Sequence, residues 1–493
     1  MFFFVMSLWL TDWVVAPSGG NFSSIQAALN VAQAGDRILV RNGTYTEQIS
    51  FPRSGASGLP IQLQADTGHA PILDGTGFMG GNMVLINNRS FVSISGFEIR
   101  NLSQINDGSG VRILGSGTEI SVRNNHIHHM LGTHAMAITV YGTQSTALSQ
   151  ITIADNWVHD CQPATSEAIT LNGNINGFTV TNNLVTDVNN IGIDFIGGET
   201  DINPNPTLVA RNGVCRGNTV KRARSNYGGG YAAGIYVDGG NTITIEGNTV
   251  TECDLGIEIG AENAGTVTSA IIVRNNWIYL NDKVGIVFGG YDNTVGTTQN
   301  CLFLNNTCYF NDTLNEGLGE LWIQFASQNR VENNIFWGRP NQTLTYSESG
   351  NTQNSLNYNL WYSSQNPEWV WRGTGYTSFG SFQAASALEA QGLFANPQLA
   401  DPNNGDGHIL AGSPAENSGN PSSNAAENGS QDWDGQARIS GVIDRGMDEI
   451  QNQPGCFMEW LALWTSPGTY CAQPQMNVLA LTALLNLQCS CSP

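Results

Sequence analysis

Acidic residues gather in one stretch of the sequence, and their type and spacing suit acid–base chemistry. Asp194 opens the run D-F-I-G-G-E-T-D and Asp201 closes it, while Asp238 and Glu258 follow on two later segments of similar sequence. Two carboxyl groups about 5–5.5 Å apart can hydrolyse a glycosidic bond with retention, and two groups about 6.5–9.5 Å apart can do so with inversion. The chemistry open to these acids therefore depends on the elements that bring them together.

One short strand recurs along the chain and carries three of these acids. Its copies are GVRIL (110–114), AITVY (137–141), AITLN (168–172), GIDFI (192–196), GIYVD (234–238), GIEIG (256–260) and GIVFG (285–289). The second and fourth residues are apolar in every copy, and they predict one continuous core because strand side chains alternate between two faces. A second strand follows each copy and ends in a polar turn with Asn at 125, 156, 183, 218, 248, 276, 306 and 334. Since Asn tolerates left-handed backbone and bonds to its neighbours, stacked copies predict an Asn ladder.

This repeat predicts an all-β fold, a single-stranded right-handed parallel β-helix. Its period of about thirty residues contains short strands and no crossover helix, which excludes a leucine-rich repeat and a propeller. Residues 13–453 are expected to form this domain, with a short helix through SIQAALNVAQ, capped by Ser23 or Ser24, over its first coil. The coil is expected to run to about residue 363, with an irregular C-terminal cap after it. Residues 1–12 are interpreted as a signal remnant or a capping strand, and residues 454–493 as a Cys-containing tail without an assigned role.

The repeat register predicts one acidic patch on the outer face of the coil. Third-position residues would line up as Arg112, Thr139, Thr170, Asp194, Tyr236, Glu258 and Val287, and the fifth position adds Asn172 and Asp238. Coils stack at about 4.8 Å, so Asp194, Tyr236, Asp238 and Glu258 are expected to crowd one solvent-facing patch. Such crowding raises the pKa of at least one carboxyl group, as a general acid requires. The Gly197–Gly198 pair would permit a bend that returns Asp201 beside Asp194.

Aromatic and amide side chains near these acids predict sugar binding. Tyr227, Tyr231 and Tyr236 can stack on the CH faces of sugar rings, and Tyr236 stands in the column between two acids. The predicted substrate-binding residues are Asn172, Tyr231, Tyr236, Asp238 and Glu258.

The composition of the chain disfavours some classes of binding partner. A net charge of −21 argues against nucleic acid, whose phosphates require a basic surface, and favours a neutral glycan over a polyanion. The sequence has no apolar stretch of the length that a membrane span needs. Secretion is expected, and the oligomeric state is left open.

Histidine and cysteine residues are interpreted as structural. His126, His128, His129, His134 and His159 fall on early coils, where stacked turns bring such residues together without a metal. The Cys residues within the repeats are expected to fill the core. No metal site and no cofactor are predicted, except that acids could hold a structural Ca²⁺ ion.

Two rival functions share the same scaffold. A polysaccharide lyase acting on uronates needs a basic residue and a neutralised substrate carboxylate. The basic residues Lys221, Arg222 and Arg224 could meet this need, so a lyase is the alternative function. These residues could instead pair with nearby acids. A non-enzymatic carbohydrate-binding adhesin would use the same groove without a close carboxyl pair. The sequence contains no catalytic motif that would indicate an epimerase.

Several segments resemble the superfamily of pectate-lyase-like β-helix proteins. They are PSGGNFSSIQAALNVAQAGDRILVRNGTYTEQI, LDGTGF, the repeated NN turns and SPAENSG…DWDGQARISGVIDRGMDEI, and the resemblance covers roughly residues 13 to 450. This scaffold hosts lyases, hydrolases, epimerases and adhesive spikes. The Asp-x₆-Asp arrangement after a strand is most similar to the β-helix lacto-N-biosidase family of glycoside hydrolases. That resemblance implies Asp194 as acid/base and Asp201 as nucleophile, with release of a disaccharide from the non-reducing end of a neutral β-linked glycan.

Overall fold

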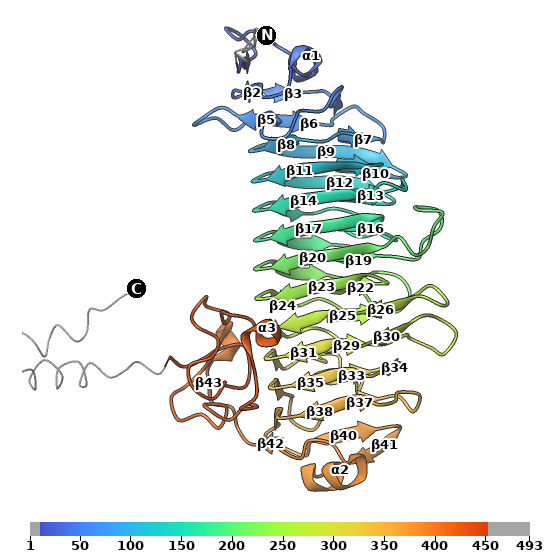
Figure 1. The fold of residues 1–493 in the computed structure, drawn as a ribbon, viewed down its shortest axis with the longest axis vertical. Helices are drawn as coiled ribbons and strands as arrows, with labels where there is room; N and C mark the ends of the chain where they lie inside the picture. The colour runs from blue at the N-terminus through green and yellow to red at the C-terminus, as the bar shows by residue number, and fades with distance from the viewer. Residues whose placement is uncertain (1–9, 452–493) are drawn as a thin grey trace, which may run out of the picture. The chain divides into compact units, whose positions relative to one another are not determined.

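The computed structural model describes residues 10–451 of the 493-residue chain, and the solenoid lies within them (Figure 1). The chain winds as a right-handed β-solenoid with three parallel sheets, here called sheets A, B and C. The expected fold class is therefore confirmed. Residues 1–9 and 452–493, including the predicted Cys-containing tail, lie outside the described part. Among the described residues, no helix has the length and apolar character needed to cross a membrane.

Sheet A contains the strands that lead into the Asn turns. In order they are β1 (Asp12–Val15), β2 (Arg37–Val40), β5 (Ile61–Ala65), β8 (Val92–Ser95), β11 (Gly117–Arg123), β14 (Leu148–Ala154), β17 (Ile175–Thr181), β20 (Ala210–Arg216), β23 (Asn241–Glu246), β27 (Ile272–Arg274), β31 (Leu302–Leu304), β35 (Arg330–Glu332) and β38 (Ser355–Asn357). Three short strands extend this sheet beside β23, namely β26 (Val267–Ser269), β30 (Thr297–Gln299) and β34 (Ala326–Ser327).

Sheet B follows the Asn turns. Its order is β3 (Thr44–Tyr45), β6 (Ile72–Asp74), β9 (Glu98–Ile105), β12 (His126–Gly132), β15 (Trp157–His159), β18 (Leu184–Val188), β21 (Thr219–Ala223), β24 (Thr249–Thr251), β28 (Trp277–Tyr279), β32 (Thr307–Tyr309), β36 (Ile335–Trp337), β39 (Leu360–Tyr362) and β42 (Leu393–Phe394).

Sheet C carries the repeat strand with the candidate acids. Its order is β4 (Ile49–Ser50), β7 (Asn82–Asn87), β10 (Gly108–Leu114), β13 (Ala135–Gly142), β16 (Ile169–Gly173), β19 (Ile193–Ile196), β22 (Ala233–Asp238), β25 (Leu255–Gly260), β29 (Val284–Phe288), β33 (Leu321–Ile323), β37 (Thr343–Ser347), β40 (Glu368–Trp371) and β41 (Thr374–Tyr376).

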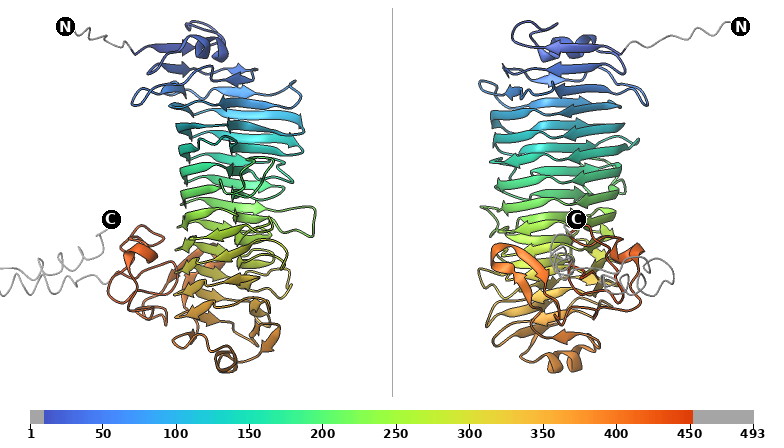
Figure 2. Two further views of the ribbon diagram at one scale, coloured as in Figure 1. Left: turned by 45° about the vertical axis from the view of Figure 1, so that its right-hand side comes forward. Right: turned by 90° about the vertical axis from the view of Figure 1, so that its left-hand side faces the viewer.

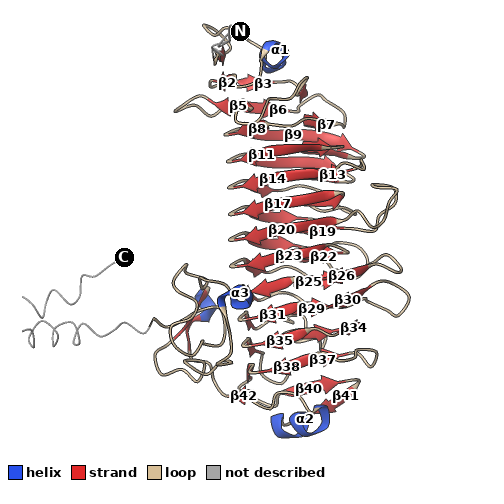
Figure 3. Ribbon diagram, in the orientation of Figure 1, coloured by secondary structure: helices blue, strands red, loops and turns tan. Residues whose placement is uncertain are grey.

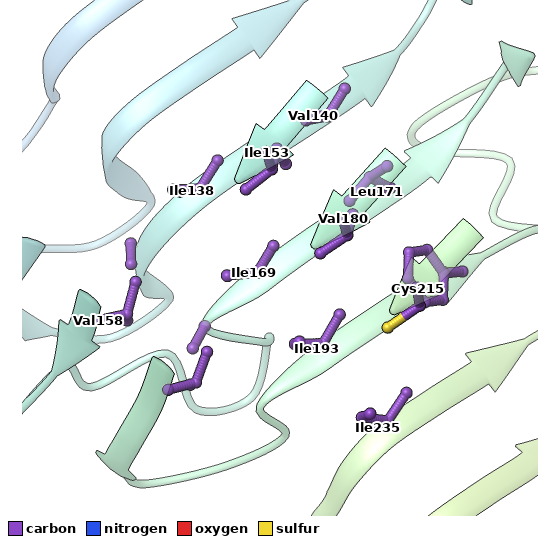
Figure 4. Packing of buried hydrophobic residues seen from close by; sticks show 14 of the residues in the cluster. Ile138, Val140, Ile153, Val158, Ile169, Leu171, Val180, Ile193, Cys215 and Ile235 are labelled. Carbon is purple, nitrogen blue, oxygen red and sulfur yellow. The ribbon is translucent and has the colours of Figure 1, made fainter. Parts of the chain in front are cut away.

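Stacked aliphatic side chains fill the space between the three sheets. Ile138, Ile169, Ile193 and Ile235 occupy the second position of successive repeat strands, and each is fully buried in the row shown in Figure 4. The predicted inward positions are therefore correct. Burying a side chain of this size is worth about 1.5–3 kcal/mol, and the benefit recurs at every turn of the coil.

A buried Asn ladder runs along the turn between sheets A and B. At each rung the side-chain amide donates to a carbonyl of the preceding coil and to Oδ1 of the next Asn, while Oδ1 accepts from the preceding Asn. Asn248 Nδ2, for example, donates to Cys215 O at 3.1 Å and to Asn276 Oδ1 at 3.0 Å. The eight predicted Asn positions form this ladder, which continues through Asn359 to Glu389.

Two further ladders were not predicted. Asn281 bonds to Asn311, which ends on Glu320, and Asn329 bonds to Asn354. The acid that ends a ladder sits within the protein, and burial raises the pKa of Glu320 to about 8. Both oxygens of Glu320 accept from Asn311, one from its backbone N–H at 3.0 Å and one from its side-chain amide at 2.6 Å, so the acid ends the ladder as an acceptor.

The N-terminal end of the coil is closed by helix α1 (Ile25–Val31), as Figure 3 shows. Ser24 caps it by accepting from Ala27 N at 3.2 Å, which confirms the second of the two predicted caps. Glu47 accepts from the Ile25 and Gln26 amides at 2.9 and 3.0 Å and so satisfies two more free N–H groups of the first turn.

The C-terminal end differs from the sequence expectation. Strand β40 continues the coil past residue 363, and β41 folds back antiparallel to it. Helix α2 (Phe379–Ser386) covers the end of the coil with Phe382 buried in the core, and β42 follows it and pairs with β39. Ser378 caps this unpredicted helix.

The expected irregular cap follows and packs against the side of the coil (Figure 2). It contains β43 (Leu399–Asp401), η1 (Pro402–Asn404), β44 (Asp406–Ile409) and α3 (Ala425–Asn428). The repeat cysteines Cys161, Cys215, Cys253, Cys301 and Cys308 are free and buried, as predicted.

The ladder predicts a specific stability effect. Asn248→Ala would leave the Asn218 backbone N–H and side-chain amide without their acceptor, and it should lower the free energy of unfolding by about 2–5 kcal/mol. Thermal or urea unfolding would measure this. Asn176→Ala, at an exposed position, is the matched control and should stay within about 0.5 kcal/mol of the parent. Equal effects of the two changes would contradict a stabilising role for the ladder.

Candidate active site

The predicted acids line up on the outer face of sheet C. Thr170 pairs with Asp194, Asp194 with Tyr236, and Tyr236 with Glu258 on consecutive strands. Asp238 shares this face, two residues beyond Tyr236 on β22. At about 4.8 Å per strand, Asp194 and Glu258 lie two rungs, or about 9–10 Å, apart along the column.

This face is more enclosed than the sequence predicted. Asp194 is 1% exposed and Asp238 5%, whereas the repeat register placed both toward solvent. Loops follow β19 and β25 and project from the solenoid on the side away from the C-terminal cap (Figure 1). These two loops meet where Gly198, with φ of 89°, faces Asn263 and Thr266, since a Cβ on Gly198 would lie 2.6 Å from Thr266 Oγ1. An outward-facing residue of a solenoid is thus buried where neighbouring loops are long.

Two acids that the repeat analysis missed belong to the same group. Glu167 is 9% exposed and directly precedes the repeat strand in β16. Glu262 follows β25, and its backbone N–H donates to Asp238 Oδ1 at 2.7 Å. The signal in the sequence was an acid just outside a repeat strand of sheet C, whereas the prediction rested on positions within the strands. Glu167, Asp194, Asp238, Glu258 and Glu262 are hereafter called the acid patch.

Burial and mutual repulsion raise the pKa of every carboxyl group in the acid patch. Burial is the largest cause for Asp194, followed by the charges of Glu167 and Asp238. Glu167 has a pKa of about 8 because of burial and of the charges of Glu199 and Glu262. The pKa values of Asp238, Glu258 and Glu262 are raised for the same two reasons. Part of this group therefore carries protons at neutral pH, which is the condition for a general acid.

Asp201, which was expected to return beside Asp194, is exposed at a turn of the β19 loop. That turn instead brings Glu199 to the sheet, where Asn172 Nδ2 donates to Glu199 Oε2 at 2.6 Å. The charge of Asp201 contributes to raising the pKa of Glu199, after burial. The charges that act on Asp194 come from Glu167, Asp238 and Glu262, so its acidic neighbours differ from the predicted one.

The predicted sugar-binding residues fall into two groups. Tyr236 is 4% exposed and lies over Gly260, and its hydroxyl group acts to lower the pKa of Glu262, so it lies among the acid patch. Asn172 is also buried, and its Oδ1 accepts no hydrogen bond from the described residues. Tyr231 is 47% exposed and its ring lies 4.5 Å from Lys283 Nζ.

The basic residues of the run from Lys221 to Arg224 are already paired. Lys221 binds Glu252 at 2.8 Å, Arg222 binds Asp187 at 2.5 Å, and Arg224 binds Asp282 at 2.8 Å. The structure thus supports the pairing interpretation of this run, which begins on β21 of sheet B.

Arg112, the cation in the same column as Asp194, stands three rungs away and forms a two-bonded ion pair with Asp107.

Two groups of described residues could hold a metal ion, and neither is the acid patch. One comprises His126, His128 and His159 on sheet B, and the other His408, Asp434 and Asp448 in the C-terminal cap. In the second group, bonds to Asp434 and Asp406 outweigh burial and raise the pKa of His408 to about 9. His408 is therefore held there as a cation by its acidic neighbours.

The raised pKa of Glu167 predicts a pH-dependent stability. Because the folded pKa of about 8 exceeds the ordinary value of 4.5 for a glutamate, this group favours the folded state most below pH 4.5, and the benefit is lost as pH rises through 8. Glu167→Gln should therefore raise the melting temperature at pH 9 relative to the parent, and change it less at pH 5. The corresponding gain in the free energy of unfolding at pH 9 is at most about 5 kcal/mol. Melting curves across this range would measure the difference.

Glu119→Gln, at an exposed position, is the control for that comparison. A difference between parent and Glu167→Gln that does not vary with pH would contradict a protonated Glu167.

Sequence and structure comparisons place the chain among known proteins. Residues 17–201 match the family described as Pel9A-like, right handed beta helix region. The uncharacterized protein YwoF of Bacillus subtilis (strain 168) is 34% identical over 428 residues, which cover 81% of this chain and 91% of YwoF.

Solved structures with the same fold include a surface adhesin and two enzymes. PfbA, a surface adhesin of Streptococcus pneumoniae, matches with a TM-score of 0.51 at 13% identity, over 72% of this chain and 89% of PfbA. A GH136 lacto-N-biosidase from Eubacterium ramulus gives 0.47 at 12% identity, over 71% of this chain and 64% of the enzyme, which is less than two thirds of its length. Pectate lyase Pel9A gives 0.42 at 16% identity, over 90% of this chain and 98% of the lyase.

At such identities these structural similarities show the fold alone. The identity to YwoF over most of both chains is a stronger relationship. The chain belongs to the same family as YwoF, within the superfamily of pectate-lyase-like right-handed parallel β-helix proteins.

Proposed function

We propose that this protein is a glycoside hydrolase in which Asp194 is the general acid. The observation that carries the proposal is the burial of Asp194 among ionisable acids on the outer face of sheet C. A carboxyl group must keep its proton near neutral pH to protonate a leaving sugar oxygen, and burial beside like charges is how proteins achieve this.

The electrostatic influence of Glu167 on Asp194 suggests the partner of the general acid. The charge of Glu167 raises the pKa of Asp194, so Asp194 holds its proton more tightly once Glu167 has ionised. We therefore assign the second carboxylate to Glu167. It would either attack the anomeric carbon or take a proton from the attacking water, while Asp194 gives its proton to the departing oxygen.

The resemblance to lacto-N-biosidase-type enzymes assigns the second carboxylate to Asp201 instead. Asp201 is exposed, and its charge acts on Glu199. Movement of the β19 loop on substrate binding would be needed to bring its carboxylate to Asp194. The charge of Glu167 already acts on Asp194, and for this reason Glu167 is our first choice.

The substrate we propose is a neutral, β-linked glycan, from which the resemblance implies release of a disaccharide at the non-reducing end. The acid patch would repel a uronate, and the basic residues that could neutralise one are paired elsewhere. Asn172 Oδ1 is a free acceptor for a sugar hydroxyl group, and the ring of Tyr236 stands between Asp194 and Glu258. A secreted protein would meet such a glycan outside the cell.

Asp194→Asn should lower kcat/KM by about 10²–10⁴ because an amide cannot protonate the leaving group. Mass spectrometry of products from a panel of neutral and uronate glycans would measure it, and hydrolysis adds one water per bond cleaved. Glu167→Gln should lose activity to a similar extent, and parental activity should rise as the pH passes through about 8, where Glu167 ionises. Asp155→Asn, on an exposed turn, is the control and should retain full activity.

Asp201→Asn distinguishes the two assignments. Full activity supports Glu167, whereas a loss comparable to that of Asp194→Asn moves the second role to Asp201. Unsaturated products without added water would replace the hydrolase with a lyase. Glycan binding without any product would leave a carbohydrate-binding function, and each variant needs a melting curve to show that it folds.

A further inference from the structure

A group of imidazole rings on the outer face of sheet B has no part in the proposed hydrolysis. His126 and His128 are alternate residues of β12, so they point to the same side, and His159 on the next strand, β15, stands opposite His128. The three residues are partly exposed, so an ion could reach them from solvent. The acid patch lies on sheet C, a different face of the coil.

The ring nitrogens of these three residues converge. One nitrogen from each residue lies within 4.8 Å of the other two, and His126 Nε2 is 2.7 Å from His159 Nε2. Zinc binds imidazole nitrogen at about 2.0–2.1 Å with tetrahedral geometry, so two nitrogen ligands of one ion lie about 3.3–3.4 Å apart. Small rotations of the side chains would bring the three nitrogens into this range.

Neighbouring side chains hold the rings in place. Asp160 Oδ2 lies 2.7 Å from His159 Nδ1, so it can accept the proton there and leave Nε2 with a free lone pair. Trp157 stacks on His126 with ring centroids 4.2 Å apart and an interplanar angle of 4°. A carboxylate bonded to the far nitrogen of a histidine is the usual outer partner of a metal ligand.

The charge around the rings does not oppose a cation. Arg100, opposite His128 on β9, is the nearest basic side chain in the strand pairing. Its guanidinium group is bonded to Asp74 at 2.8 Å and to Glu98 at 2.6 Å. Glu98 Oε1 also lies 3.3 Å from His128 Nε2, which places a carboxylate beside the rings.

We propose that His126, His128 and His159 form a binding site for a divalent transition metal ion of the zinc class. Imidazole ligands favour zinc, copper, nickel and cobalt over calcium and magnesium, which prefer oxygen. Three protein ligands leave a fourth position for water, as in zinc sites that are open to a further ligand. The sequence alone favoured a structural stack of histidines, because it did not show that the ring nitrogens converge.

Titration of the full-length, chelator-treated protein with Zn²⁺ by calorimetry, and with Co²⁺ by visible spectroscopy, would test this site. The parent should bind one equivalent through these residues, with a Co²⁺ spectrum of nitrogen and oxygen ligands. His159→Ala should weaken that binding at least 100-fold, and Asp160→Asn about 10- to 100-fold because it removes only the outer partner. His134→Ala and His408→Ala are the matched controls and should leave it unchanged.

Equal binding by parent and His159→Ala would overturn the proposal and leave a stack of histidines without a metal. Equal weakening in His408→Ala would move the site to the C-terminal cap and overturn it as well. If His159→Ala unfolds, His126→Gln gives a second variant, and circular dichroism checks both. Because binding is measured directly, the result does not depend on the hydrolase assignment.

Discussion

The buried Asn ladder is the constraint on which the rest of the structure depends. Each Asn uses its donor and acceptor groups on the coils before and after it, so a shift of one residue in any coil would leave amides without partners inside the protein. The aliphatic rows also oppose a shift of one residue, which would turn them outward, but they oppose a shift of two residues less strictly, because Ile, Val and Leu pack in several ways. The ladder therefore fixes which residues face each other across successive strands.

The same register creates the acid patch, and the burial of these acids lowers the stability of the fold. Asp194, Tyr236 and Glu258 stand on consecutive strands because the coils cannot slip. Burying carboxyl groups side by side opposes folding unless they hold protons, and the large hydrophobic core offsets that cost. Carboxyl groups with strongly raised pKa values, gathered on one face of a stable scaffold, are typical of a functional site.

The two faces of the solenoid carry different chemistry on the same scaffold. Sheet C carries acids with raised pKa values, whereas sheet B carries partly exposed imidazoles. Residues two apart on one strand, or opposite on the next, are brought together by the same spacing in both cases. A β-helix can therefore acquire separate sites by substitution on one face without disturbing the core.

The repeat by itself determined the fold, the inward positions, the Asn ladder, and the alignment of Asp194 with Tyr236 and Glu258. These follow from a local pattern with a fixed period, which needs no knowledge of distant contacts. The tertiary structure decided how deeply the patch is buried, that Glu167 and Glu262 join it, and that Glu199, not Asp201, returns to Asn172. These features depend on the conformation of the loops. That conformation depends on tertiary contacts such as that of Gly198 with Thr266, which the repeat pattern does not predict.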